Sequence, residues 1–174
     1  EKVYKSVQEM AGELVKLYSA REQKHGFVFS EDGYLQAAFE EAFPYDETED
    51  QIVAANEIKK DMQSTKIMDR LLCGDVGYGK TEVAMRAAYK AVIDGKQVAF
   101  MCPTTILSQQ HFNTCQTRFK DFMVRVEVLN RFKTPKQQKE ILEKLKKGEI
   151  DVICGTHRLL GKDVEFKDLG LLIL

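Results

Sequence analysis

The sequence predicts an α/β fold in which helices cover both faces of an open, parallel β-sheet and a long helix precedes the sheet. Two observations carry this prediction. From about residue 68 onward, short apolar runs alternate with segments of helical periodicity, and this alternation implies parallel strands joined by right-handed crossovers. The predicted strands are also almost continuously apolar, which is typical of a sheet covered on both faces.

The composition fits a soluble globular protein. The 174 residues suffice for one α/β domain with an additional helix. The net charge of −1 argues against a wholly cationic nucleic-acid binder but allows a local basic face. We find no apolar run long enough to span a membrane and no signal peptide, so a cytoplasmic protein without a membrane partner is expected. The four cysteines lack C-x-x-C spacing, and we interpret them as buried apolar residues.

Three helices are predicted before the alternating region. In the first, apolar side chains recur at spacings of three and four residues. This stripe must pack on a later part of the chain or on another part of a larger protein. The second helix has Ser30 or Asp32 as its cap. The predicted helices are Glu1–Lys24, ended by His25-Gly26, a segment from after Ser30 to about Ala42, and Thr48–Met62.

The alternating region supplies the strands and helices of the sheet. Its most strongly marked helix has Thr134 as cap, Pro135 at the first position and Gly148 after the last. A turn is predicted at Asp94-Gly95. The predicted strands are Met68–Cys73, Gln97–Cys102, Val124–Leu129, Asp151–Cys154 and Leu171–Leu174, and the helices are Lys80–Ile93, Ile106–Lys120 and Pro135–Lys147.

A glycine-rich loop joins the first predicted strand to a helix. Glycines let its backbone turn N–H groups toward phosphate oxygens, and the helix N-terminus favours negative charge. Lys80 can reach the β- and γ-phosphates, and the Thr81 hydroxyl can ligate Mg²⁺. We therefore predict an ATP and Mg²⁺ site whose catalytic side chains are Lys80 and Thr81. The loop reads Gly74-Asp75-Val76-Gly77-Tyr78-Gly79-Lys80-Thr81, a match to the Walker A pattern.

Two interpretations compete for Thr48-Glu49-Asp50-Gln51. The T-x-x-Q spacing is that of a capping box, in which Thr48 caps the helix and Gln51 bonds back. Alternatively, the Gln51 amide presents a donor and an acceptor that suit the edge of adenine, and nearby Phe43 or Tyr45 stacks on the base. Spacing alone favours the capping box.

Three loops follow predicted strands and offer groups suited to phosphate. The carboxyl ends of parallel strands share one edge of a sheet, where ligands bind. Hydroxyls, cations and an aromatic ring together fit contacts to a nucleic-acid backbone, although each loop alone is as well explained by helix capping or solvation. The candidate residues are Thr104, Thr105, Arg131, Thr156, His157 and Arg158.

Several segments together resemble superfamily 2 helicase motors, closest to the bacterial transcription-repair coupling factors and next to RecG helicases. They are FPYDETEDQ, GDVGYGKTEVAMRAA, PTTILSQQH, LNRFKT and GTHRLL. The resemblance implies a RecA-like fold and ATP bound between two lobes that move along double-stranded DNA. It implies that RNA polymerase and excision-repair proteins bind other domains. It divides the chain into a connecting helix (1–25), a short helix with a lead-in (26–47) and an incomplete first lobe (48–174).

The resemblance also assigns roles. It implies that Gln51 reads adenine, while Thr48 can still cap. Lys80 and Thr81 bind phosphate and Mg²⁺, and the loops that contain Thr104, Arg131 and Arg158 contact DNA.

The sequence departs from the family pattern at one point. An acidic D-E-E-x box should follow LLIL, but the sequence ends at Leu174. We therefore expect a fragment that binds nucleotide weakly, hydrolyses almost none and self-associates through a truncated sheet. The alternatives are a RecG-like branched-DNA motor, a P-loop kinase or other NTPase, and an interaction module whose first helix docks a partner.

Overall fold

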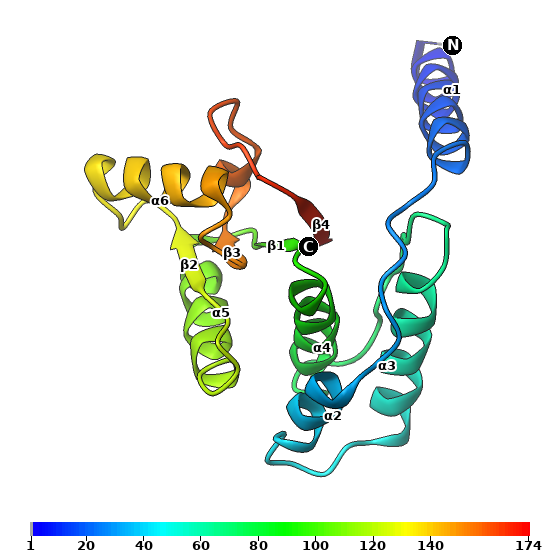
Figure 1. Ribbon diagram of the computed structural model, residues 1–174. Coiled ribbons are helices and arrows are strands. Elements are labelled where there is room, and N and C mark those ends of the chain that lie inside the picture. Colours follow the sequence, from blue (N-terminus) through cyan, green and yellow to red (C-terminus); the bar gives the residue numbers. More distant parts are fainter. Residues whose placement is uncertain (1) are drawn as a thin grey trace.

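The computed structural model describes residues 2–174 (Figure 1). Its four strands form one sheet in the order β2-β3-β1-β4, and each neighbouring pair is parallel. The predicted α/β class with a parallel sheet is therefore confirmed. The elements are α1 (Lys2–Glu22), α2 (Tyr34–Glu41), α3 (Glu49–Met62), α4 (Lys80–Ile93), β1 (Gln97–Met101), α5 (Thr105–Arg118), β2 (Val126–Leu129), α6 (Pro135–Lys147), β3 (Val152–Gly155), the 3₁₀ helix η1 (His157–Leu160) and β4 (Leu169–Ile173).

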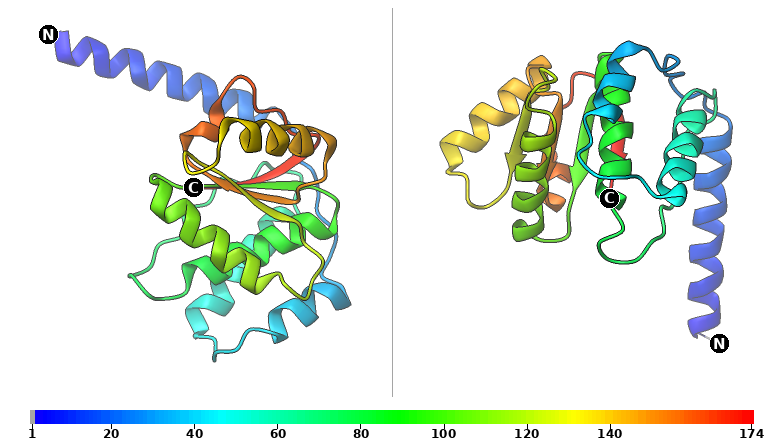
Figure 2. Two further views of the ribbon diagram at one scale, coloured as in Figure 1. Left: turned by 90° about the vertical axis from the view of Figure 1, so that its left-hand side faces the viewer. Right: turned by 90° about the horizontal axis from the view of Figure 1, so that it is seen from below.

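Helices cover both faces of the sheet (Figure 2), as predicted. Side chains alternate along β1, so Val98 and Phe100 enter one hydrophobic cluster and Ala99 enters another. The larger cluster joins the sheet to α2, α3, α4 and α5, whereas the smaller one joins it to α6 and η1. Among the described helices, none is long and apolar enough to cross a membrane.

Local chemistry places the helix ends where the sequence marks them. Both α4 and α6 have the predicted bounds. Thr134 accepts a hydrogen bond from the Gln137 N–H at 3.3 Å, Pro135 opens α6, and Gly148 ends it with a φ of 76°. This positive φ favours glycine because a Cβ atom would clash with the backbone.

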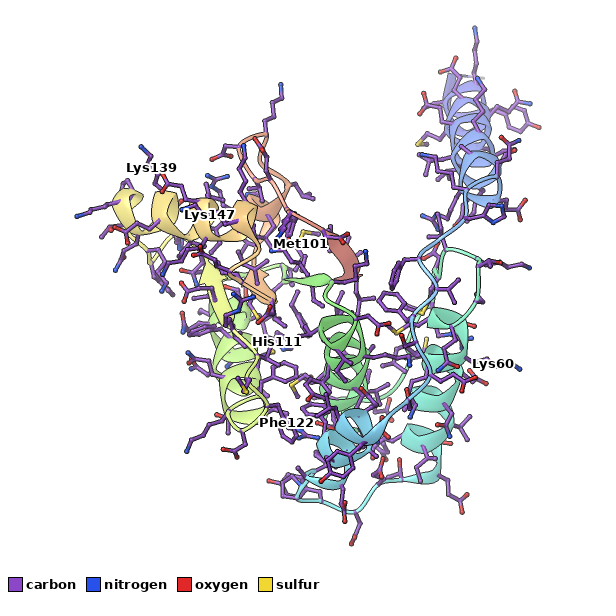
Figure 3. The ribbon with its side chains drawn as sticks, in the orientation of Figure 1. Lys60, Met101, His111, Phe122, Lys139 and Lys147 are labelled. Atoms are coloured by element: carbon purple, nitrogen blue, oxygen red, sulfur yellow. The ribbon has the colours of Figure 1, made fainter. Side chains whose placement is uncertain are left out.

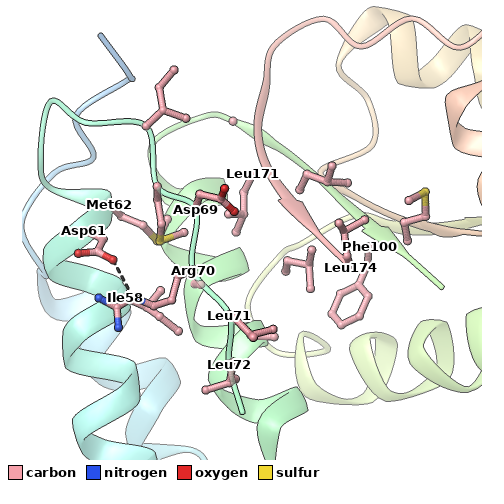
Figure 4. A pocket seen from close by; sticks show the side chains of 18 of the residues that line it. Ile58, Asp61, Met62, Asp69, Arg70, Leu71, Leu72, Phe100, Leu171 and Leu174 are labelled. Atoms are coloured by element: carbon pink, nitrogen blue, oxygen red, sulfur yellow. Dashed lines mark hydrogen bonds and ion pairs between the residues drawn. The ribbon is translucent and has the colours of Figure 1, made fainter. Parts of the chain in front are cut away.

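The predicted strand Met68–Cys73 is wrong, because the structure has no strand there. An apolar run becomes a strand only when its backbone pairs with a neighbour, and none of the described backbone hydrogen bonds reaches residues 68–73. A cavity of about 890 Å³ lies between this segment and β4, lined by Leu71 and Leu72 on one side and Leu171 on the other (Figure 4). The Leu71 side chain is 86% exposed.

The predicted cap of α2 is also wrong. Gly33 occupies the N-cap position and makes no side-chain hydrogen bond. Ser30 and Asp32 have tertiary partners instead, because Lys90 Nζ on α4 donates to the Ser30 carbonyl and to the Asp32 carboxylate, each at 2.6 Å. Lys59 Nζ on α3 lies 2.8 Å from Asp32. Asp32 thus joins the start of α2 to two other helices.

Helix α1 projects from the rest of the molecule (Figure 2). It ends at Glu22, slightly before the predicted Lys24. Its apolar side chains stay exposed, for example Val7 at 53% and Leu14 at 56%. Arg21 forms an ion pair with Asp69 at the base of the helix. The expected packing of the stripe onto a later segment is therefore not seen in the described residues.

Candidate functional site

The glycine-rich loop has the backbone that phosphate binding requires. Gly77 and Gly79 have φ values of 87° and 69°, which favour glycine. Gly79 is the N-cap of α4 and provides no side-chain cap, so the first N–H groups of α4 keep their capacity to donate. A helix N-terminus in this state attracts an anion through its free donors and its dipole.

The Lys80 side chain lies in the glycine-rich loop, where a phosphate would also bind. Its Nζ atom donates to the Gly74 carbonyl at 2.5 Å and to the Asp75 carbonyl at 2.6 Å. Thr81 follows on α4 and, with Lys80, lines the 890 Å³ cavity. Within the described residues the Thr81 hydroxyl makes no hydrogen bond, so its oxygen is available to a metal ion. These donors fit a nucleotide triphosphate with Mg²⁺.

Gln51 serves as a capping residue and also contacts the phosphate loop. The Thr48 N–H donates to Gln51 Oε1 at 2.9 Å, and the Gln51 N–H donates to Thr48 Oγ1 at 3.3 Å. The capping box predicted from spacing is therefore confirmed. Gln51 Nε2 also donates to the Tyr78 carbonyl at 2.8 Å, a contact that spacing did not reveal. The adenine role of Gln51 stays a prediction.

Aromatic rings from the segment before α3 lie near two cations. The Cζ atoms of Arg86 and Arg118 lie 5.6 Å and 5.7 Å from the centre of the Phe43 ring. The Tyr45 ring meets Phe43 edge-on at 5.5 Å and is 73% exposed. Phe43 is thus partly engaged by guanidinium groups, while Tyr45 presents a free ring to solvent.

A buried charge cluster connects this segment to the phosphate-loop helix, and sequence reasoning missed it. Glu82 on α4 is 5% exposed and accepts from Arg86 Nε at 3.0 Å and Arg118 Nη2 at 2.8 Å. Arg86 also pairs with Glu47. Burial opposes the charge of Arg86, but the hydrogen bonds to Glu82 and Glu47 outweigh it and raise the pKa of Arg86. The available signal was the oppositely charged i,i+4 pair Glu82 and Arg86.

The structure brings the three candidate DNA loops to one edge of the sheet. They follow β1, β2 and β3, which are parallel neighbours. Arg131 and His157 are exposed, whereas Thr104 and Thr105 lie at the start of α5, where Thr104 Oγ1 accepts from the Leu107 N–H at 3.2 Å.

Two further candidates at this edge, Thr156 and Arg158, also have partners. Thr156 is 8% exposed and accepts from the Arg158 N–H at 3.5 Å. The Arg158 guanidinium makes two bonds to Asp163, at 2.7 Å and 2.5 Å. These bonds lower the pKa of Asp163 and hold Arg158 in place.

His111 on α5 is a second feature that sequence reasoning missed. Its ring stacks on Phe100 of β1, with 4.7 Å between ring centres and 27° between planes. It lines the 890 Å³ cavity together with Lys80 and Thr81. It also lines a groove of about 560 Å³ with Thr81 and residues of α5. Burial lowers the pKa of His111.

The cysteines do not form a metal site. Within residues 2–174, no group of three or more His, Cys, Asp or Glu side chains is arranged to hold a metal ion. Cys102, Cys115 and Cys154 are buried as expected, but Cys73 is exposed. Its exposure follows from the missing strand, because residues 68–73 have no neighbouring strand to cover them.

A parallel sheet flanked by helices, with a Walker A loop opening α4, defines a RecA-like ATP-binding domain of the P-loop class. The chain belongs to the DEAD/DEAH box helicase family, whose model matches residues 48–174.

Relatives and solved structures agree with this assignment. The chain is 58% identical over 174 residues to the transcription-repair-coupling factor of Bacillus subtilis (strain 168), covering 100% of this chain and 15% of the relative. It is 56% identical over 173 residues to that of Staphylococcus aureus (strain USA300), covering 99% of this chain and 15% of the relative. A structure of RecG bound to a three-way DNA junction matches 90% of this chain and 22% of that one, with 41% identity and a TM-score of 0.84. This chain thus spans only a small part of its relatives.

Proposed function

We propose that this chain is the ATP-binding lobe of a double-stranded DNA translocase. The longer protein would displace stalled RNA polymerase and couple transcription to nucleotide-excision repair in the cytoplasm. The observation that carries this proposal is the 58% identity to a transcription-repair-coupling factor along the whole chain. RNA polymerase and repair proteins would bind other parts of the longer protein.

Within this lobe, ATP binds at the start of α4. The loop Gly74–Thr81 and the N-terminus of α4 hold the phosphates, with Lys80 exchanging its carbonyl partners for phosphate oxygens. The Thr81 hydroxyl would hold Mg²⁺, whose positive charge would neutralise charge on the phosphates. Gln51 reads adenine from the α3 side, and Phe43 with Tyr45 offers the aromatic surface.

The 174-residue chain should bind nucleotide but hydrolyse little of it. Hydrolysis needs a carboxylate that orients the attacking water or the metal. Two aspartates, Asp61 and Asp69, line the cavity beside Lys80, but Arg70 engages Asp61 and Arg21 engages Asp69. DNA-stimulated turnover at the rate of an intact motor would contradict this proposal.

Nucleotide binding can be tested by titrating the chain with a fluorescent ATP analogue. Lys80→Ala should weaken binding about ten- to one-hundred-fold, the loss of a charge-assisted hydrogen bond. Lys139→Ala is the matched control, because Lys139 is exposed on α6, which packs on the opposite face of the sheet from α4. Equal nucleotide affinities of the two variants would contradict the assignment of the loop as the phosphate site.

The sheet edge that carries Thr104, Thr105, Arg131, Thr156, His157 and Arg158 would contact the DNA backbone. Backbone contacts release counterions, so duplex binding should fall steeply with salt. Arg131→Ala should weaken binding to all duplexes and reduce the slope of log affinity against log salt by about 1. If Arg131→Ala leaves this slope unchanged, Arg131 does not contact the DNA backbone.

A RecG-like motor on branched DNA is the second candidate, favoured by the match to RecG bound to a three-way junction. Competition between a duplex and a three-way junction of the same sequence distinguishes the two. A strong preference of the longer protein for the junction would favour this second function. A P-loop kinase would instead bind neither DNA.

A further inference from the structure

His111 lies on the opposite side of α4 from the adenine side. Gln51 reaches the phosphate loop from α3, at 2.8 Å from the Tyr78 carbonyl. Helix α5, which carries His111, flanks the other side of α4 (Figure 1, Figure 3). A nucleotide whose base lay at Gln51 and whose phosphates followed the loop would therefore carry its terminal phosphate and metal ion on the side of α5.

The two cavities around His111 agree with this placement. The larger cavity is lined by Lys80, Thr81 and His111. The smaller groove, between α4 and α5, is lined by Thr81 and His111 but not by Lys80. Thr81 is the residue whose hydroxyl fits Mg²⁺. His111 thus shares both of its cavities with the proposed metal ligand.

The imidazole has unused hydrogen-bonding capacity. Within the described residues, no hydrogen bond or ion pair is made by the His111 side chain, whereas its ring is fixed by stacking on Phe100 at 4.7 Å. An imidazole always keeps at least one N–H donor. A half-buried polar ring that is held in place but unpartnered is well suited to bind a ligand in the adjoining cavity.

We propose that His111 binds the terminal, metal-bound end of the nucleotide triphosphate by hydrogen-bonding to its oxygen atoms. This inference rests on the proposed ATP site. It adds a third side chain to Lys80 and Thr81, contributed by α5. Since α5 also begins at Thr104, on the edge proposed for DNA, the same helix would touch the nucleotide and the nucleic acid.

Two substitutions separate hydrogen bonding from packing. His111→Phe keeps a ring for stacking on Phe100 but has no polar atom, and His111→Gln keeps a donor but loses the ring. If His111 binds nucleotide, the Phe variant should bind Mg²⁺–ATP about three- to tenfold more weakly, as one lost hydrogen bond implies, and the Gln variant should stay close to the unaltered chain. If the residue only packs, the order of the two variants reverses.

The measurement is titration of the 174-residue chain with a fluorescent ATP analogue in Mg²⁺, and with a fluorescent ADP analogue in a chelator. The loss in His111→Phe should appear with Mg²⁺–ATP and disappear with metal-free ADP, which lacks the terminal phosphate. His25→Phe is the control, because His25 is exposed and lines neither cavity.

Unchanged Mg²⁺–ATP affinity in His111→Phe, with binding lost in Lys80→Ala, overturns the role of His111 and leaves the ATP site standing. An unaltered chain that binds no nucleotide overturns both.

Discussion

At position 79, both the backbone conformation and the packing require glycine. Its φ of 69° favours glycine, and a Cβ atom there would lie 2.3 Å from Gln51 Nε2. Any larger residue must therefore strain the loop and push away the amide that contacts Tyr78. Close packing of this kind is invisible in sequence, where Gly79 is marked only by its place in the Walker A pattern.

Gly79→Ala should lower the free energy of unfolding by roughly 1–2 kcal/mol through the left-handed backbone alone, and it should weaken nucleotide binding. Urea unfolding and nucleotide titration check both effects. Gly12→Ala is the matched control, because Gly12 lies within α1 with no atom within 4 Å of an added Cβ. A Gly79→Ala chain as stable as the unaltered one would contradict the strain argument.

Glu82 should be among the most sensitive charged residues in the molecule. Removing it leaves Arg118 without a carboxylate partner and leaves Arg86, which is only 4% exposed, with Glu47 alone. Breaking a buried pair in this way costs about 3–5 kcal/mol. Urea unfolding of Glu82→Ala should show that loss, and Glu143→Ala, at an exposed position of α6, should not. A small effect of Glu82→Ala would mean that the cluster is readily hydrated.

At the scale of elements, α2, α3 and α4 are joined by charge as well as by apolar packing. Burial of Asp32 opposes its ionisation, but hydrogen bonds from Lys59 and Lys90 outweigh this and lower the pKa of Asp32. A carboxyl group whose pKa is lower in the folded than in the unfolded state stabilises the fold at pH values above the unfolded-state pKa. That contribution is lost as the pH falls through the folded value.

The stability difference between the unaltered chain and Asp32→Asn should therefore be full near neutral pH and shrink below about pH 4. Urea unfolding at a series of pH values measures it. Asp46→Asn is a suitable control, since Asp46 is exposed and makes no hydrogen bond or ion pair with the residues that the structure describes. A difference that is constant with pH would show that Asp32 acts through its shape and not its charge.

Helix α1 should be dispensable for the stability of the remaining chain. Its apolar side chains are exposed, and its Arg21–Asp69 ion pair has side chains that are 35% and 58% exposed, a class of pair that contributes about 0–1 kcal/mol. Deleting residues 2–22 should leave the unfolding transition of the rest within about 1 kcal/mol. A large loss of stability would show that α1 packs on the domain in solution.

The elements also show what sequence can and cannot predict. Helix ends set by neighbouring residues, such as Thr134 and Gly148 of α6, were predictable because their chemistry is local. Strand pairing is not local. Four of the five predicted strands are present, but Met68–Cys73 reads as a strand and has no neighbour in the structure. For the site, the Walker A loop and Gln51 were visible as patterns. His111 was not, since its ring packs on Phe100 of another element. For Glu82, the local partner Arg86 was visible in the sequence, but the distant partner Arg118 was not.

At the scale of the whole molecule, the sheet has an open edge at β4, which pairs only with β1 in the described residues. Unpaired strand edges recruit other chains, and Leu172 on β4 is 47% exposed. Sedimentation should show self-association that rises with concentration, and Leu172→Lys should reduce it. A monomer at every concentration would contradict this prediction.

The exposed Cys73 gives the molecule a natural attachment point for a spectroscopic reporter. Three of the four thiols are buried, and burial, followed by the charge of nearby Cys115, raises the pKa of Cys102 to about 11, which suppresses its reactivity. A maleimide dye should therefore label the native chain at one position, immediately before Gly74. The phosphate loop can then be followed in real time without any amino-acid substitution.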